Sequence, residues 1–177
     1  MEIVPEDSAA RRPRGVRWVM AGAAALVVAA DQISKTLILA ANPPYGESGW
    51  IMVRLVRNTG ASGGIASGYP VLVTLAALVI AVLAALLAVR SRSRTAAISL
   101  AVVCGGALGN LADRIFRAPG FGRGGVVDWI HIAGGGGSFN VADTAIQLGV
   151  IVTVVAMFTA DRAPRRSPRD MQVQKAE

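Results

Sequence analysis

Three aspartates of this chain lie inside or at the edge of long apolar segments, and a fourth lies in a loop between two such segments. They are Asp31, Asp113, Asp143 and, in the loop, Asp128. Two carboxyl groups held close together cannot both ionise easily, so the pair shares a proton. One member can then act as a base on water while the other protonates a carbonyl oxygen or a leaving group. Such a pair would hydrolyse an amide without a metal or a cofactor.

Other catalytic arrangements find little support in the composition. The chain has one histidine, His131, and one cysteine, Cys104, which excludes an intramolecular disulfide. Cys104 lies among apolar neighbours, where a thiol is usually inert, and a zinc site needs three or four His, Cys or acidic ligands. A Ser–His–Asp arrangement is available in composition only, because no Gly-x-Ser-x-Gly motif is present. We therefore expect paired carboxylates, no metal and no cofactor.

The elements that would position these acids are transmembrane helices. The 177 residues are 53% hydrophobic, with a mean hydropathy of +0.51, which indicates an integral membrane protein. Apolar segments cover residues 18–41, 69–89, 95–112 and 141–160. Each is close to the ~20 residues that cross a bilayer as a helix. The arginine-rich start of the first segment resembles a signal peptide, but no convincing cleavage site follows, so we expect a retained helix.

The distribution of basic residues predicts the orientation. Most Lys and Arg residues lie in the two terminal tails and in the short turn at residues 90–94, and few lie in the long loops 42–68 and 113–140. The positive-inside rule then places both termini in the cytoplasm and both long loops outside. The net charge of +7 is grouped beside apolar segments and not along an amphipathic face, so we expect no nucleic-acid partner.

The polar residues of three expected helices reach the same depth. Counted from the cytoplasmic arginines at ~1.5 Å per residue, Asp31, Lys35, Asn110, Asp113 and Asp143 all lie roughly 21–28 Å up. This height is near the outer boundary of a hydrocarbon core that is about 30 Å thick. Asp128 can join them from the outer loop, so the sequence predicts a polar cluster at that boundary.

Each of these residues also has a purely structural interpretation. Asp143 could cap the fourth helix, because Asp favours a helix N-terminus. Asp31 and Lys35 are four residues apart and could pair on one helix face, and Asp113 could pair with Arg114. Asn110 could serve only in helix packing. Convergence of the whole set at one height favours a functional site.

Five short motifs occur in order along the chain: DQISK (31–35), RNTGASGG (57–64), GGALGNLADRI (105–115), VVDWI (126–130) and FNVADTA (139–145). Together they strongly resemble bacterial lipoprotein signal peptidase, also called signal peptidase II, over about residues 31–149. The resemblance implies an intramembrane aspartic protease that removes the signal peptide from prolipoproteins. It also implies cleavage just before a cysteine that carries a diacylglyceryl group.

The resemblance, and not the depth argument, selects the catalytic pair. It assigns catalysis to Asp128 and Asp143, whereas depth alone leaves Asp113 as a further candidate. It implies substrate-binding or supporting roles for Asp31, Lys35, Asn58, Gly60, Asn110, Asp113, Arg114 and Asn140. In this interpretation Arg114 holds Asp113 in a bidentate pair, and Asn side chains fix the substrate backbone.

Two positions depart from the family pattern. Gly63 stands where the family usually has a bulky aromatic residue, which could loosen a contact with substrate. Thr144 follows the last aspartate where the family often has Ser, and this change keeps the hydroxyl group. Neither departure removes an acid.

The sequence thus predicts an all-α membrane protein, a bundle of four transmembrane helices with a small extracytoplasmic strand and loop element. Residues 50–57 suit a short surface strand. We expect one protease domain at residues 15–162, between disordered cytoplasmic tails at 1–14 and 163–177. The expected partners are a lipid-modified prolipoprotein and membrane lipids, with the protein a monomer in the bacterial inner membrane. The alternative from another class is an ion-coupled transporter or proton relay.

Overall fold

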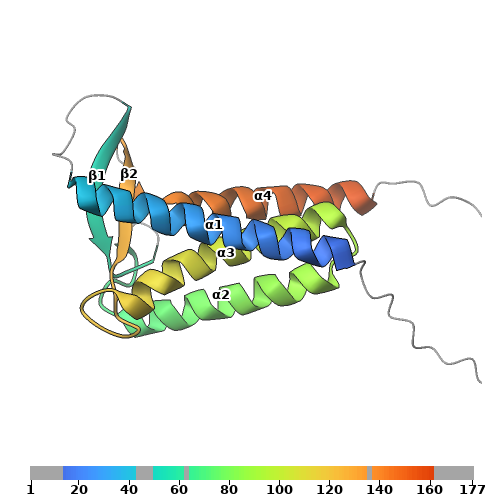
Figure 1. Cartoon of the computed structure of the whole chain (residues 1–177), viewed down its shortest axis with the longest axis horizontal. Helices are drawn as coiled ribbons and strands as arrows, with labels where there is room; N and C mark the ends of the chain where they lie inside the picture. The colour runs from blue at the N-terminus through green and yellow to red at the C-terminus, as the bar shows by residue number, and fades with distance from the viewer. Residues whose placement is uncertain (1–13, 43–49, 62–63, 135–136, 162–177) are drawn as a thin grey trace, which may run out of the picture.

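Four long helices run side by side, and a small sheet lies across one end of them (Figure 1). The computed structural model describes residues 14–42, 50–61, 64–134 and 137–161. The helices are α1 (Arg14–Ala41), α2 (Pro70–Arg90), α3 (Arg94–Phe116) and α4 (Val141–Asp161), and the strands are β1 (Ile51–Asn58), β2 (Val126–Ile132) and β3 (Ser138–Phe139). The expected tails, apart from Arg14, and Gly63 lie outside the described residues.

The expected all-α membrane architecture is confirmed. All four helices are long and apolar enough to cross a membrane. Their large side chains point outward, as on α2, where Leu72, Leu78 and Leu86 are exposed. Such a surface suits lipid, because acyl chains are as apolar as leucine.

Helix α3 occupies the centre of the bundle and lies against α1, α2 and α4 (Figure 1). Its contact surfaces are made of small residues. A Cβ added at Gly105 would come within 2.6 Å of the Ala24 carbonyl oxygen on α1, and one at Gly106 would come within 2.6 Å of the Ala142 carbonyl oxygen on α4. These two consecutive glycines face different neighbours and bring the backbones of α1 and α4 close to α3, as is common between transmembrane helices.

One predicted boundary is wrong. The third apolar segment was expected to end at Ala112, but α3 continues to Phe116 and includes Asp113 and Arg114. A prediction from hydropathy ends the segment before its first charged residue, Asp113. The helix continues because its charged side chains find partners inside the protein, as described below.

The sheet stands at the end of the bundle where α1 ends and α4 begins (Figure 1). Strand β1 confirms the strand expected at residues 50–57 and pairs antiparallel with β2, with Val56 opposite Asp128. Strand β3 pairs with the other edge of β2 and ends at Phe139, two residues before α4 begins. The sheet therefore brings Asp128 next to the N-terminus of α4.

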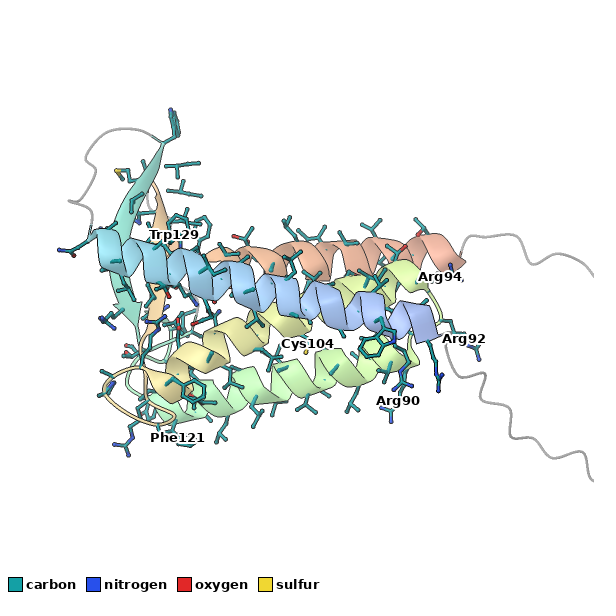
Figure 2. All side chains as sticks on the ribbon, viewed as in Figure 1. Arg90, Arg92, Arg94, Cys104, Phe121 and Trp129 are labelled. Carbon is teal, nitrogen blue, oxygen red and sulfur yellow. The ribbon has the colours of Figure 1, made fainter. Side chains whose placement is uncertain are left out.

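The basic turn between α2 and α3 lies at the opposite end of the molecule. Arg90, Arg92 and Arg94 gather there, while Trp129 of β2 lies at the sheet end (Figure 2). With the positive-inside rule, this separation places the sheet outside the cytoplasm. That orientation stays a prediction.

We expect Gly105→Ala and Gly106→Ala each to lower the unfolding free energy by about 1–3 kcal/mol, because the added methyl group overlaps a neighbouring helix backbone. Thermal unfolding of the purified protein in detergent measures this. Gly22→Ala on α1 is the matched control, since its Cβ meets nothing within 4 Å. Equal melting temperatures for all three variants would show that α3 does not pack as closely as described.

Candidate active site

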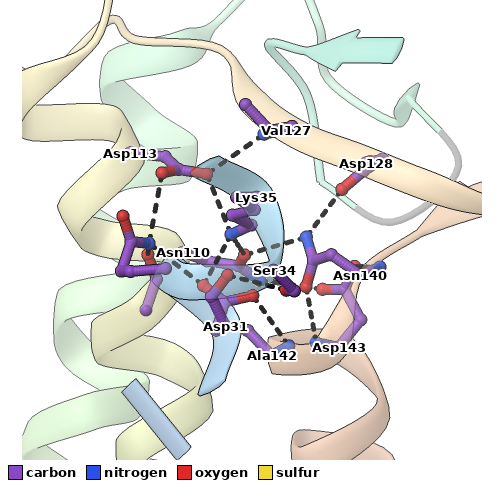
Figure 3. Close-up of polar contacts among 12 residues, drawn as sticks. Asp31, Ser34, Lys35, Asn110, Asp113, Val127, Asp128, Asn140, Ala142 and Asp143 are labelled. Atoms are coloured by element: carbon purple, nitrogen blue, oxygen red, sulfur yellow. Dashed lines mark hydrogen bonds and ion pairs between the residues drawn. The ribbon is translucent and has the colours of Figure 1, made fainter. Parts of the chain in front are cut away.

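A buried group of charges joins α1 to α3. The Lys35 ammonium lies 2.7 Å from an Asp31 carboxylate oxygen and 2.8 Å from one of Asp113 (Figure 3). All three side chains are 0% exposed. The expected pairing of Asp31 with Lys35 is thus confirmed, but Lys35 also bridges to a second helix. Gly109 makes room for this, because a Cβ there would come within 2.7 Å of Asp31 Oδ2.

Two further residues complete this charge cluster, and the sequence analysis missed both. Arg117 Nε lies 2.6 Å from Asp113 Oδ1, and Gln32 Nε2 donates to Asp31 Oδ2 and Asp113 Oδ1 at 3.0 and 3.2 Å. With Lys35, Arg117 gives two cations for two carboxylates. Its spacing of four residues from Asp113 on a helix was a signal that could have identified it.

The charge cluster also holds two backbone amides that precede Asp128 and Asp143. Asp31 Oδ1 accepts from the Ala142 N–H at 3.0 Å, and Asp113 Oδ2 accepts from the Val127 N–H at 3.0 Å. Ala142 directly precedes Asp143, and Val127 directly precedes Asp128. The cluster therefore fixes the backbone beside both candidate catalytic acids without using either of them.

Asp143 does take part in capping α4. The Asn140 side-chain oxygen accepts from the Asp143 N–H at 2.9 Å, while Asp143 Oδ2 accepts from the Asn140 N–H at 3.1 Å. This reciprocal pattern is a capping box. The Thr144 hydroxyl donates to the Asn140 carbonyl at 3.0 Å, so the hydroxyl kept at this position is used. The cap uses only one carboxylate oxygen of Asp143. The other oxygen, Oδ1, accepts a hydrogen bond from Asn110 Nδ2 at 2.8 Å.

Asp128 extends from β2 and is only 2% exposed. Asn58 Nδ2 donates to one of its oxygens at 3.0 Å, and Asn140 Nδ2 donates to the other at 2.7 Å. Burial raises the pKa of Asp128 to about 6, and the nearby Asp143 adds to the rise, although the two Asn donors and Lys35 oppose it. A carboxyl group with such a pKa keeps its proton more readily than an exposed one.

Two asparagines connect the two acids. Asn140 Nδ2 donates to both Asp128 Oδ1 and Asn110 Oδ1, and Asn110 Nδ2 donates to Asp143 (Figure 3). The amide oxygen of Asn110 also accepts from Lys35 at 3.1 Å. Both polar atoms of the Asn110 side chain thus have hydrogen-bond partners. Asn110 is therefore part of the site and does more than pack between helices.

The predicted pairing of Arg114 with Asp113 is wrong. Arg114 Nη2 donates to the Gly60 carbonyl at 2.5 Å, and Nη1 donates to the Thr59 carbonyl at 3.4 Å. Adjacent residues on a helix do not face each other, so Asp113 points to α1 while Arg114 points to the loop after β1. Arg114 therefore anchors that loop, and Asn58 at the end of β1 also accepts from the Gly60 N–H of the loop at 2.9 Å.

Both candidate acids line one cavity of ≈ 160 Å³. Its polar wall is completed by three residues expected at the site, Asn58, Asn110 and Arg114. The other walls are apolar and come from α2, α3, β2 and α4: Val73, Ala76, Ala77, Ile80, Ala107, Val126 and Ile146. The cavity thus combines two acids and their polar neighbours with a mostly apolar wall.

Two other kinds of site, a metal site and a serine nucleophile site, lack support in the described residues. Within the described residues, no group of three His, Cys, Asp or Glu side chains is placed to hold a metal ion. His131 Nδ1 lies 3.3 Å from the Ser138 hydroxyl, but among the described residues no carboxylate is hydrogen-bonded to the ring. A Ser–His pair without an orienting acid lacks the third member of a triad.

Comparison with known proteins supplies the family. Residues 23–159 match the family described as signal peptidase (SPase) II. The chain belongs to the signal peptidase II family. Its relatives include the lipoprotein signal peptidases of Streptomyces griseus, 40% identical over 86% of this chain and 80% of the relative, and of Mycobacterium avium, 37% identical over 94% and 92%.

A solved structure described as a bacterial membrane enzyme shows the same fold, with a TM-score of 0.72 over 85% of this chain and 93% of that chain. Its sequence identity is 23%, so that likeness concerns the fold alone. Membership of the signal peptidase II family makes this chain a multi-pass membrane peptidase, and it favours peptide hydrolysis over the transporter alternative.

We expect Lys35→Met to lower the unfolding free energy by about 3–5 kcal/mol, because it leaves two buried carboxylates without their shared cation. Arg117→Met should cost less, since Arg117 is 21% exposed and Asp113 keeps Lys35. Melting temperature and the yield of folded protein in membranes measure both effects. A Lys35→Met protein as stable as wild type would contradict the role of the charge cluster.

A pH-dependent difference in stability should follow from Asp128. Its folded pKa of about 6 lies above the ordinary 3.8, so the folded protein loses stability as Asp128 ionises with rising pH. Asp128→Asn has no such loss. We expect its stability relative to wild type to rise by about 2 kcal/mol between about pH 4.5 and 7.5. Thermal unfolding across this range tests it, with Gly22→Ala as the control whose difference from wild type should not vary with pH.

Proposed function

We propose that this peptidase removes the signal peptide from diacylglyceryl-modified prolipoproteins, cutting just before the lipidated cysteine, and that Asp128 and Asp143 activate the attacking water. The observation that carries this proposal is the cavity that both acids line from two separate elements, β2 and α4. The names of the relatives support the substrate class.

The proposed reaction uses one proton shared by the pair. The ionised acid takes a proton from water, the water oxygen attacks the scissile carbonyl carbon, and the protonated acid donates to the carbonyl oxygen. The tetrahedral intermediate then collapses as a proton passes to the amide nitrogen and the C–N bond breaks. Either acid can hold the shared proton before the attack, because the two carboxyl groups titrate as a pair.

The remaining site residues orient these two acids in this proposal. Asn58, Asn110 and Asn140 donate to the carboxylates, and Arg114 fixes the loop that carries Gly60. Gly60 allows that loop to close, because a Cβ there would overlap the Ile65 carbonyl. Asp31, Lys35 and Asp113 act through the backbone amides described above. They are positioning residues and make no direct contact with the reacting atoms.

The substrate would enter from the membrane. Its apolar signal peptide would lie along the cavity wall of α2, and the cavity volume of ≈ 160 Å³ would admit only small side chains before the cut. The acyl chains would stay in the lipid around the exposed helix surfaces. In this proposal the active site lies near the outer leaflet, both termini are cytoplasmic and the protein acts as a monomer among membrane lipids.

Cleavage of a purified diacylglyceryl-modified prolipoprotein tests the proposal. We expect Asp128→Asn and Asp143→Asn to lose activity by about 10²–10⁴-fold or more while remaining folded, because each removes one proton-transfer group. Asp113→Asn keeps both acids and should retain part of the activity, because it alters only the positioning of Asp128. Ser138→Ala is the control for serine chemistry and should cleave like wild type.

Cleavage by either Asp128→Asn or Asp143→Asn at the wild-type rate would remove that residue from the catalytic pair. Loss of activity in Ser138→Ala with the fold intact would instead favour the Ser138–His131 contact as the nucleophile pair. A wild-type protein that leaves the lipidated substrate uncut would contradict the proposed substrate class.

A further inference from the structure

A second cavity, of ≈ 350 Å³, lies on the sheet and its connecting loops, and no helix residue lines it. It shares Asn58 and Asp128 with the apolar cavity, so the two cavities meet at the candidate catalytic acid. Apart from Val56, its other side chains are polar or basic, and they include Arg54, Arg57 and His131. The wall chemistry therefore changes from apolar to cationic on passing Asp128.

The two arginines of this outer cavity lack charged partners in the described part of the chain. Neither Arg54 nor Arg57 forms an ion pair there, and the guanidinium groups make no side-chain hydrogen bond. Both residues are exposed. The acid that lines the cavity is Asp128, whose two oxygens are already taken by Asn58 and Asn140. The cavity thus presents positive charge to whatever enters it.

We propose that this outer cavity binds the mature side of the substrate, and that Arg54 and Arg57 favour acidic residues at the second and third positions after the cut. The lipidated cysteine is counted as the first position. This inference rests on the proposed function and adds a specificity to it.

The direction of the substrate follows from the two cavities. A peptide whose scissile amide lies at Asp128 must extend one way into the apolar slot and the other way into the outer cavity. The signal peptide is apolar, whereas the mature part is polar and leaves the membrane. The apolar signal peptide then contacts the apolar cavity, and the polar mature part contacts the cationic cavity.

The positions follow from where the two arginines lie about Asp128. Val56 lies opposite Asp128 on the neighbouring strand. Arg57 is one residue from Val56 in one direction and Arg54 is two residues from it in the other, so at ~3.3 Å per residue their backbones lie roughly 3 and 7 Å from that point, on opposite sides of it. The second and third residues of the substrate are the first to enter the outer cavity beyond the lipidated cysteine, and both arginines line that cavity. A carboxylate at either position comes within reach of a guanidinium, with which it can form a bidentate pair.

The test compares two lipidated substrates that differ only at those positions, Asp-Asp against Asn-Asn. We expect wild type to show a kcat/KM about three- to tenfold higher for Asp-Asp, because exposed ion pairs are individually weak. The difference should lie mainly in KM and should shrink in high salt, because exposed charges are screened. Arg54→Gln with Arg57→Gln should bring the ratio of the two kcat/KM values to about one.

Charge reversal gives the sharper result. In Arg54→Glu with Arg57→Glu the preference should invert, so that a Lys-Lys substrate is cut faster than Asp-Asp. Ratios within one variant cancel any effect on Asp128 itself. Arg123→Gln, a cation outside this cavity, is the matched control and should keep the wild-type ratio.

Three outcomes distinguish a failure of the proposed specificity from a failure of the proposed function. If wild type cuts both substrates equally well, the cationic specificity is wrong while the proposed function stands. If it cuts neither, the proposed function itself fails. If Arg54 and Arg57 change the dependence of activity on anionic lipid in vesicles, and not the substrate ratio, the cavity binds a lipid headgroup and the inference is overturned.

Discussion

The structure depends on the burial of Lys35 between Asp31 and Asp113. Charges at this depth are tolerated only when they are paired and hydrogen-bonded, so α1 and α3 are tied together at one height. The remaining carboxylate oxygens accept the amides of Ala142 and Val127. Four elements, α1, α3, β2 and α4, are thereby assembled around one ammonium group. The ion pairs and hydrogen bonds among these groups offset the energetic cost of burying the charges. Because those contacts form only when the four elements pack in this way, they favour this one packing arrangement.

The two acids proposed for catalysis sit next to these anchored amides, and each has a second structural duty. Asp143 completes the capping box of α4, and Asp128 accepts from two asparagines of other elements. A helix N-terminus places its third residue at a fixed position relative to its cap, so capping and catalysis make the same geometric demand on Asp143. The structural interpretation of that residue and the functional one are therefore compatible.

A membrane peptidase must present an apolar segment and a polar segment of one substrate to the same acids. Here a slot walled by alanines of α2 and α3 meets a cationic cavity on the sheet, and Asp128 lies at the junction. In the proposed function the sheet would serve this purpose, because it stands across the end of the bundle and adds a polar wall beside the apolar helices. The loop held by Arg114 closes the junction from the side of β1.

The sequence by itself determined the four helices and one of the three strands, and it predicted a common height for the polar residues of the helices. Hydropathy is local, so the four spans, the strand at β1 and the common depth of Asp31, Asn110, Asp113 and Asp143 followed from residue order and helix rise. The five motifs then pointed to the family that the comparisons show. Selecting Asp128 and Asp143 over Asp113 needed that resemblance, because depth cannot distinguish acids at one height.

Only the tertiary structure decided which charges pair. Arg114 is next to Asp113 in the chain yet bonds the loop after β1, while Arg117 and Lys35 neutralise Asp113. The end of α3 was misplaced for the same reason, since hydropathy treats Asp113 as a charge without knowing its partners. Pairing depends on the rotation of each helix about its axis and on which helix lies beside it. Those are properties of the packed bundle, and no single segment of the sequence contains them.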